Sequence, residues 1–169
     1  MKEIFYSSCQ FPSWTIFIAA TRKGICRISF CKKESAFLEE LKNTFKGDVQ
    51  FKKDFKKLKK YITILESYFK KKRKKLCLPT EILSGTSFQK KVWNILKEIP
   101  FGQIRTYKYV AHKIAKPKAF RAVGNAIGKN PLPIIIPCHR VIRSDGKIGG
   151  FSGGVKFKKE LLKLENISK

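Results

Sequence analysis

Residues 131–154 read PLPIIIPCHRVIRSDGKIGGFSGG, and the C-terminal half of the chain is organised around this stretch. The thiol of Cys138 follows an apolar run and precedes a glycine-rich loop, with Pro137 before it and His139 after it. A free cysteine has a pKa of about 8.5, so a reactive cysteine needs a base or a positive field to form thiolate at neutral pH. The sequence therefore indicates Cys138 as a candidate nucleophile and His139 as its base.

A group that could orient this imidazole appears when residues 155–165, VKFKKELLKLE, are wound as a helix. The apolar side chains of this helix form one arc: Val155, Phe157, Leu161, Leu162 and Leu164. Glu165 falls inside the arc, where a carboxylate is costly unless it is paired. Lys158 also falls there, but at the first turn, from which it is expected to reach water. The pattern indicates a Cys138–His139–Glu165 relay. It equally allows an inert buried thiol, an imidazole satisfied by backbone and a carboxylate at a frayed helix end.

Two short helices are predicted upstream of the thiol. Thr106 is a suitable N-cap for YKYVAHKI (107–114), and the link AKPK (115–118) leads to AFRAVGNAIGKN (119–130). The apolar residues of the second helix share one face: Phe120, Val123 and Ile127. The outer face is basic and made of small residues: Lys118, Ala122, Asn125, Ala126 and Lys129, with Arg121 flanking. This arrangement indicates a helix-turn-helix, and an ordinary helical hairpin is the alternative. Small residues would let the helix backbone approach something narrow.

The N-terminal part predicts three short strands and then helices. The strands are IFYSSC (4–9), WTIFIAAT (14–21) and GICRISF (24–30), followed by a helical pattern in SAFLEELKNTF (35–45). Residues 51–69, FKKDFKKLKKYITILESYF, carry one apolar stripe on a strongly basic helix. The stripe is more typical of a domain core than of a helix lying on a membrane. The lysine run that ends this helix, residues 70–75, fits either a solvated face or contact with phosphates.

A break in these patterns around LCLP and Ser84-Gly85 predicts two domains, 1–79 and 80–169. The second begins with a helix in GTSFQKKVWNILKEIPFG (85–102), which Pro100 and Gly102 stop. The apolar residues expected to face inward are Phe88, Val92, Trp93, Ile95 and Leu96. The fold class expected is α/β (α+β): a small N-terminal sheet with helices, and a mainly helical C-terminal domain.

The charge is the outlier of the composition. The chain has 38 Lys and Arg against 12 Asp and Glu, a net charge of +26, which attracts polyanions. Nucleic acid is the favoured partner and an anionic membrane a weaker one, while a lysine-biased proteome would explain the same surface without function. No run of residues is long and apolar enough to span a membrane, and the N-terminus does not resemble a signal peptide.

Cysteine usage indicates a reducing compartment. The five cysteines are scattered, without paired spacing, so free thiols and a cytoplasmic location are expected. The histidines are His112 and His139, and no metal-ligand spacing recurs, so no metal site is predicted.

The segment RAVGNAIGKNPLPIIIPCHRVIRSDGKIGGFSGGVKFKKELLKLE (121–165) resembles the O6-alkylguanine-DNA alkyltransferases, also called methylated-DNA–protein-cysteine methyltransferases. Pro-Cys-His-Arg-Val with an upstream Asn-Pro is a highly specific signature of this family. The likeness continues upstream through GTSFQKKVWNILKEIPFGQIRTY (85–107) and LESYF (65–69). It covers residues from about 65 to the end well, and the N-terminal part only in its general layout, which is ribonuclease H-like in the family.

The resemblance implies a role for each matching residue of the reaction centre. Cys138 would attack the alkyl carbon on guanine O6, in irreversible single-turnover repair that needs no cofactor. His139 would take the thiol proton through a water, and Glu165 would hold the imidazole. Asn130 would brace the active-site turn, and Tyr107 would donate a proton towards the leaving base.

The resemblance also implies how DNA is bound. The partner would be double-stranded DNA containing O6-alkylguanine, bound by a monomer through the minor groove with the lesion flipped out of the stack; O4-alkylthymine stays open as a substrate. Arg121 would enter the duplex in place of the flipped nucleotide. The other residues assigned to DNA or to the alkylguanine pocket are Ala122, Ala126, Arg140, Val141 and Ser152. Phe151, Lys108 and Lys71 depart from the family pattern, which often has Tyr at the first position and Gly at the other two.

Two other classes of function stay open on the sequence alone. A non-catalytic protein that marks damaged DNA would bind the lesion without gaining mass at Cys138. A cysteine hydrolase would turn over an ester or amide many times instead of stopping after one event.

Overall fold

The computed structural model describes residues 2–11, 14–31 and 33–168, and the chain in it forms two compact units that divide between Ser84 and Gly85. The segment just before this point belongs to the first unit through backbone pairing. The amide of Ile25 donates to the carbonyl of Pro79 at 2.9 Å, and the amide of Glu81 donates to the carbonyl of Ile25 at 2.9 Å. The observed division therefore lies a few residues beyond the predicted boundary at residue 80.

The first unit is built on a four-stranded sheet in the order β3-β2-β1-β4. Its strands are β1 (Lys2–Phe11), β2 (Trp14–Ala20), β3 (Ile25–Ser29) and β4 (Val49–Lys53). β1 pairs antiparallel with β2 and parallel with β4, and β2 pairs antiparallel with β3. The three strands predicted from the sequence are confirmed, and β4 is one more than was expected.

The prediction that a helix begins at Phe51 is wrong, because Phe51 lies in β4, opposite Ile4 of β1. The helix α2 (Phe55–Phe69) begins four residues later. The side chain of Asp54 accepts a hydrogen bond from the backbone amide of Lys57 at 3.0 Å, which caps the helix. This cap and the pairing with β1 together outweigh the apolar periodicity that continues through the strand.

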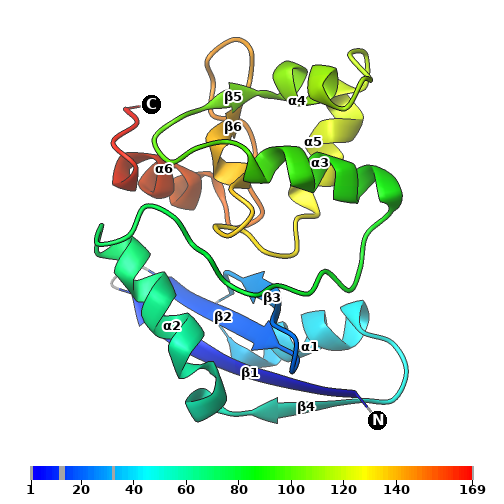
Figure 1. Cartoon of the computed structure of the whole chain (residues 1–169), viewed down its shortest axis with the longest axis vertical. Helices are drawn as coiled ribbons and strands as arrows, with labels where there is room; N and C mark the ends of the chain where they lie inside the picture. The colour runs from blue at the N-terminus through cyan, green and yellow to red at the C-terminus, as the bar shows by residue number, and fades with distance from the viewer. Residues whose placement is uncertain (1, 12–13, 32, 169) are drawn as a thin grey trace. The chain divides into compact units, whose positions relative to one another are not determined.

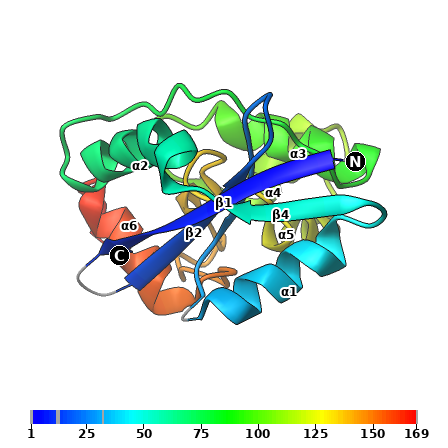
Figure 2. The ribbon, with the colours of Figure 1, turned by 90° about the horizontal axis from the view of Figure 1, so that it is seen from below.

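Two helices cover the two faces of the sheet, as Figure 2 shows for α1 (Glu34–Thr44) and α2. Alternation along the strands explains this arrangement, because successive side chains point to opposite faces. Ile4 and Tyr6 of β1 pack in one buried cluster with Phe37 of α1. Phe5 lies on the other face, where the Nζ atom of Lys57 in α2 is 3.5 Å from its ring centroid.

The second unit is mainly helical (Figure 1). Its helices are α3 (Ser87–Lys97), α4 (Tyr107–Lys113), α5 (Phe120–Gly128) and α6 (Val155–Leu164), with a single 3-10 turn, η1 (Cys138–Arg140). Two short parallel strands, β5 (Arg105–Thr106) and β6 (Val141–Ile142), join the segment before α4 to the segment after η1. The mixed α/β fold with a helical C-terminal part is confirmed.

Local signals in the sequence set these helices. Thr86 and Gln89 form a capping box at the start of α3, and Thr106 caps α4 through the amide of Tyr109. The helix-turn-helix predicted at residues 107–130 is formed by α4 and α5. Trp93 of α3 ties this pair to the core, since its indole donates to the carbonyl of Ala126 at 2.9 Å. Within the described residues, none of the helices combines the length and the apolar character needed to cross a bilayer.

Candidate active site

Cys138 opens the turn η1, and Asn130 holds the segment that leads to it. The amide nitrogen Nδ2 of Asn130 donates to the carbonyl of Ile136 at 2.8 Å, and its Oδ1 accepts from the backbone amide of Leu132 at 3.0 Å. The amide of Cys138 itself donates to the carbonyl of Ile136 at 2.7 Å. Asn130 is 5% exposed, so water does not compete for these hydrogen bonds, and they hold the turn in place. This is the geometry that a bracing side chain requires.

His139 and Glu165 form a fully buried pair. Nε2 of His139 lies 2.8 Å from Oε1 of Glu165, and both side chains have 0% exposed area. Oε2 of Glu165 also accepts from the backbone amide of Gly102 at 3.0 Å. Burial lowers the pKa of His139, and the nearby carboxylate opposes this shift without reversing it. The imidazole is therefore neutral at pH 7, and it donates its Nε2 proton to the carboxylate.

Arg140 completes the environment of the Glu165 carboxylate. Its guanidinium donates to Glu165 through Nε at 2.9 Å and through Nη2 at 2.8 Å, and Nη1 donates to the carbonyl of Ile99 at 2.6 Å. Burial raises the pKa of Glu165, but hydrogen bonds from His139 and Arg140 outweigh burial and lower it to about 2. Arg140 is 7% exposed, and each of its three guanidinium nitrogens donates within this buried cluster. Its predicted contact with DNA stays a prediction.

The other nitrogen of the imidazole, Nδ1, is the one that can accept a proton. It is buried and has no hydrogen-bond partner among the described protein groups. Because Nε2 carries the proton shared with Glu165, Nδ1 carries the lone pair. A base with one fixed and one unengaged nitrogen is suited to receive a proton from the neighbouring thiol or from a water beside it.

The thiol of Cys138 is 2% exposed and is protonated in the resting protein. Burial raises its pKa to about 11, and a hydrogen bond from Asn130 and the positive charge of Lys158 act in the opposite direction. The sulfur is therefore not a standing thiolate at neutral pH. To act as a nucleophile it would need a base, and the imidazole of the next residue has an unengaged nitrogen suited to that role.

The prediction that Lys158 reaches water from the first turn of the helix is wrong. Its side chain has 0% exposed area, and its ammonium donates to the carbonyls of Val141 at 2.6 Å, Ile148 at 2.7 Å and Gly150 at 3.2 Å. The sequence did indicate that Lys158 needs a polar partner, because it is a charged residue inside an apolar arc, as Glu165 is. It could not indicate that the partners are backbone carbonyls from separate positions along the chain.

Tyr107 lies close to the sulfur and against the glycine-rich loop. Burial raises the pKa of its phenol, and the charge of a Cys138 thiolate would raise it further. A Cβ atom built on Gly149 would lie only 2.9 Å from the phenol oxygen, so a glycine is required there for Tyr107 to keep its place. Tyr107 also lines a cavity of about 570 Å³. The other residues of its wall are Lys108, Phe120, Arg121, Gly124, Arg143, Ser144 and Asp145.

The face of α5 is only partly as predicted. Arg121 and Ala122 are exposed, whereas Ala126 is 2% exposed and packs inward with its carbonyl bonded to Trp93. The prediction that Ala126 belongs to the outer face is therefore wrong. Phe120, expected on the buried face, is 40% exposed at the helix start and lines the cavity. A nine-residue helix has too few turns for periodicity alone to fix its orientation.

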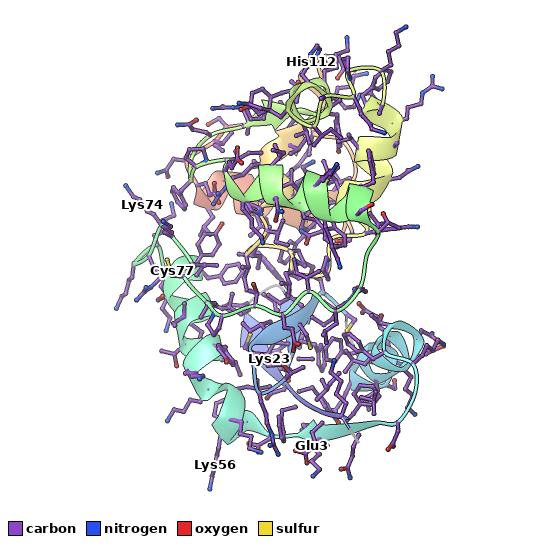
Figure 3. All side chains as sticks on the ribbon, turned by 45° about the vertical axis from the view of Figure 1, so that its right-hand side comes forward. Glu3, Lys23, Lys56, Lys74, Cys77 and His112 are labelled. Atoms are coloured by element: carbon purple, nitrogen blue, oxygen red, sulfur yellow. The ribbon has the colours of Figure 1, made fainter. Side chains whose placement is uncertain are left out.

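The predicted roles of Val141 and Ser152 in a substrate pocket stay predictions. Val141 is fully buried and its carbonyl accepts from Lys158, whereas Ser152 is exposed in the loop before α6. The second histidine, His112, is exposed on α4 and points away from the ribbon (Figure 3). Lys56 and Lys74 extend into solvent in the same view, as expected for the basic segment of the first unit.

Comparison with known proteins matches nearly the whole chain to one family. Residues 4–82 match the family described as 6-O-methylguanine DNA methyltransferase, ribonuclease-like domain. Residues 87–167 match 6-O-methylguanine DNA methyltransferase, DNA binding domain. The two matches fall within the two compact units of the fold.

Individual relatives are similar over most of their length. An inducible methylated-DNA–protein-cysteine methyltransferase of Bacillus subtilis is 41% identical over 166 residues, covering 96% of this chain and 90% of that protein. A methylated-DNA–protein-cysteine methyltransferase of Methanosarcina barkeri is 41% identical over 162 residues, covering 96% and 97%. The crystal structure of an O6-methylguanine methyltransferase of Mycobacterium tuberculosis superposes with a TM-score of 0.82 at 30% identity, covering 96% of this chain and 92% of that one. A complex of the M. tuberculosis protein with DNA gives 0.80 at 30% identity, covering 95% and 92%.

Proposed function

The chain belongs to the 6-O-methylguanine DNA methyltransferase family, and from this premise we propose that Cys138 is the residue that accepts the alkyl group from O6-alkylguanine in DNA. The similarity makes the chain a DNA-repair protein that binds DNA and transfers a methyl group from it to a cysteine of its own. The observation that carries the choice of Cys138 is the buried His139–Glu165 pair, which begins at the next residue of the chain.

The other cysteines lack this environment. Cys9 and Cys26 are buried in the sheet of the first unit, and their thiols donate to the carbonyls of Ile16 and Ala19. Burial raises the pKa of each to about 12. Cys77 is exposed, and no imidazole lies beside it in sequence. Cys138 alone among the five cysteines of the sequence has a histidine as its chain neighbour.

The proposed reaction begins with a proton transfer. Nδ1 of His139 takes the proton of the Cys138 thiol through a bridging water, and the carboxylate of Glu165 stabilises the imidazolium that forms. The thiolate then displaces guanine at the alkyl carbon: the C–S bond forms as the C–O6 bond breaks, and the electron pair of that bond stays on the base. Tyr107 donates its phenolic proton towards the departing base, so that guanine leaves neutral rather than as an anion.

The product is a thioether on Cys138. A thiolate is regenerated from a thioether only by another displacement at carbon, for which the proposed site offers no second nucleophile. Each molecule therefore repairs one lesion, and the protein is consumed stoichiometrically.

The position of the sulfur supports delivery of the base from outside the helix stack. Because Cys138 is 2% exposed, O6 cannot reach it while the guanine stays paired in a duplex. Flipping the nucleotide out costs a few kcal/mol of unstacking and unpairing. The cavity that has both Tyr107 and Arg121 in its wall is the proposed receiving space. Arg121, exposed at the start of α5, would occupy the gap left in the duplex.

The proposed docking of the helix is in the minor groove. Ala122 next to Arg121 presents little volume, which suits a narrow groove, while long donors would be needed to read bases in the major groove. Surrounding lysines add sequence-independent attraction to phosphate, so affinity should fall steeply with salt. We take the binding protein to be a monomer acting on double-stranded DNA.

The test is a mass measurement on one peptide. The protein is incubated with duplex DNA that contains O6-methylguanine, digested, and the peptide with Cys138 is analysed by mass spectrometry. The proposal expects that peptide to gain one methylene in full proportion to the lesion, and Cys138→Ala to bind the same DNA without any peptide gaining mass. Methylation at another cysteine, or tight binding with no gain of mass, would overturn the assignment of Cys138.

A further inference from the structure

Lys158 is the charged residue of the site for which the proposed reaction has no use. It lies in the first turn of α6 with 0% exposed area, and its ammonium makes three hydrogen bonds, all to backbone carbonyls. An ammonium has three hydrogens to donate, so its bonding capacity is filled. Carbonyl dipoles solvate the charge, but they do not neutralise it as a carboxylate would.

Lys158 has no carboxylate partner among the residues that the structure describes, and a buried cation of this kind is unfavourable for stability. A leucine or methionine at the same place would fill the volume without the desolvation of a charge. Burial lowers the pKa of Lys158 to about 8, and the charge of a Cys138 thiolate would raise it. The side chain therefore remains mostly protonated at neutral pH despite its burial.

The carbonyls that it holds lie in the segment directly after the acceptor. Val141 follows η1, and Ile148 and Gly150 stand on the far side of the turn closed by the bond from the amide of Arg143 to the carbonyl of Lys147, at 2.9 Å. One ammonium thus fastens both arms of residues 141–150 to α6. Gly149, between two of these contacts, is the residue against which the phenol of Tyr107 packs.

Lys158 differs from Arg140, another buried cation near the sulfur, in how its charge is compensated. The cation of Arg140 is already matched by the carboxylate of Glu165, to which it is bonded. The ring of Tyr107 lies 5.9 Å from Nζ of Lys158, and the charges of Cys138 and Lys158 influence each other's protonation. The titratable and charged groups facing the pair from the surrounding elements are His139 and Arg140 on η1, Tyr107 on α4, Arg143 in the turn and Glu165 after α6.

We propose that Lys158 is a positioning residue whose ammonium stabilises the thiolate of Cys138 during transfer and fastens segment 141–150 to α6. The inference rests on the proposed function, in which Cys138 is the acceptor. Lys158 gives up no proton and forms no bond to substrate. The thiol proton goes to His139, the negative charge that develops on sulfur is stabilised by the fixed ammonium, and the charge disappears when the neutral thioether forms.

The test uses the pH dependence of transfer from free O6-methylguanine base, which removes DNA binding from the measurement. Single-turnover rates are followed by the mass of the Cys138 peptide for the wild type, Lys158→Met and Lys158→Gln. Methionine keeps the volume without charge or donors, and glutamine keeps two donor hydrogens without charge. Lys159→Met, an exposed neighbour on the same helix, is the matched control for loss of one lysine.

If the proposal holds, both Lys158 variants react at least about tenfold more slowly at neutral pH, and their difference from the wild type narrows as the pH rises through about 8, where the ammonium loses its charge. Lys159→Met keeps the wild-type profile. A purely structural role would lower the rate by one factor at every pH, and that result would overturn the proposal. So would a wild-type profile in Lys158→Gln.

Two further outcomes are decided by separate readouts. If Lys158→Met does not fold, the rate of Lys158→Gln relative to the wild type must still recover as the pH rises through about 8. If the wild type itself gains no mass at Cys138 from either base or DNA, the proposed function fails, independently of Lys158.

Discussion

The Nε2 atom of His139 lies 2.8 Å from Oε1 of Glu165, in a pair with no solvent-exposed area. This contact fixes the tautomer of the imidazole and leaves Nδ1 for proton transfer. Glu165→Gln keeps the size of the side chain but removes the charge that stabilises the imidazolium. Alkyl transfer should slow by about 10²- to 10⁴-fold, the usual contribution of a positioned acid–base group, without ending. Single-turnover kinetics with lesion-bearing duplex measures it.

The control for this variant is Glu160→Gln, which neutralises another carboxylate on α6 outside the relay. It should react at the wild-type rate. Because Arg140 also depends on Glu165, the folded fraction of Glu165→Gln is checked first by circular dichroism. An unchanged rate in a folded Glu165→Gln protein would remove Glu165 from the relay.

The same carboxylate should make stability fall in acid. Its pKa is about 2 in the folded protein against 4.5 for a glutamate side chain in water, so protonation is harder in the folded state than in the unfolded state. This stabilisation is complete above pH 4.5 and is lost as the pH falls towards 2, with a total of about 3 kcal/mol. Urea unfolding at several pH values should show this loss in the wild type and a shallower one in Glu165→Gln. Equal slopes would contradict the prediction.

Arg121 should matter only when the substrate is a duplex. The side chain is exposed at the start of α5 and lines the cavity with Tyr107, but it makes no contact with the relay among the bonds of the described residues. Arg121→Ala is expected to slow transfer from duplex by about tenfold or more while leaving transfer from free O6-methylguanine unchanged. Lys129→Ala, which removes a charge near the end of α5, should weaken duplex binding mainly at low salt. Equal loss on both substrates would reject the role of Arg121 in the duplex.

The sequence predicted the parts of this site that follow local rules. The contact between His139 and Glu165 could be expected because Glu165 interrupts an apolar arc, and the helix-turn-helix because Thr106 and the link after Ile114 mark helix ends. Both kinds of signal lie within a few residues of the feature they predict. The family signature around Cys138 then assigned roles that periodicity could not.

The features that were missed depend on contacts between distant segments. The pairing of β4 with β1 turned the start of a helical pattern into a strand. Arg140 turned inward because Glu165 and the carbonyl of Ile99 lie behind it, and Lys158 because three carbonyls converge on its ammonium. The pattern of side chains does not show which backbone carbonyls of a loop will accept hydrogen bonds. Residue types alone therefore could not predict these partners.

A backbone position in the first unit offers a test of stability alone. Lys71 follows α2 with a φ of 57°, in the left-handed region, and the bonds from Lys72 to Ser67 and from Lys71 to Tyr68 form a Schellman motif. Glycine has no steric penalty there, so Lys71→Gly should raise the free energy of unfolding by about 1 kcal/mol. Thermal or urea unfolding measures it. Lys71→Ala, which removes the same side chain but keeps the Cβ, should not stabilise, and equal effects of the two variants would contradict this cause.

Gly149 offers the sharpest test of how Tyr107 is held. Both Gly149 and Gly146 have positive φ, 73° and 81°, so an alanine at either costs about 1 kcal/mol of backbone strain. Only at Gly149 would the new Cβ meet the phenol of Tyr107, at 2.9 Å, whereas nothing lies within 4 Å at Gly146. Gly149→Ala should therefore displace the phenol and slow transfer by about 10²-fold, a typical loss when a reacting group is misplaced by an ångström.

Gly146→Ala carries the same strain without the collision, so its single-turnover rate should stay within about twofold of the wild type while its stability falls similarly. The double variant Gly149→Ala with Tyr107→Phe separates the collision with the phenol from the loss of its proton, since removing the phenol oxygen relieves the closest contact. If Tyr107 acts by giving a proton to the base, the double variant should be no faster than Tyr107→Phe alone. Equal rates for Gly149→Ala and Gly146→Ala would show that the position of the phenol is not set by this loop.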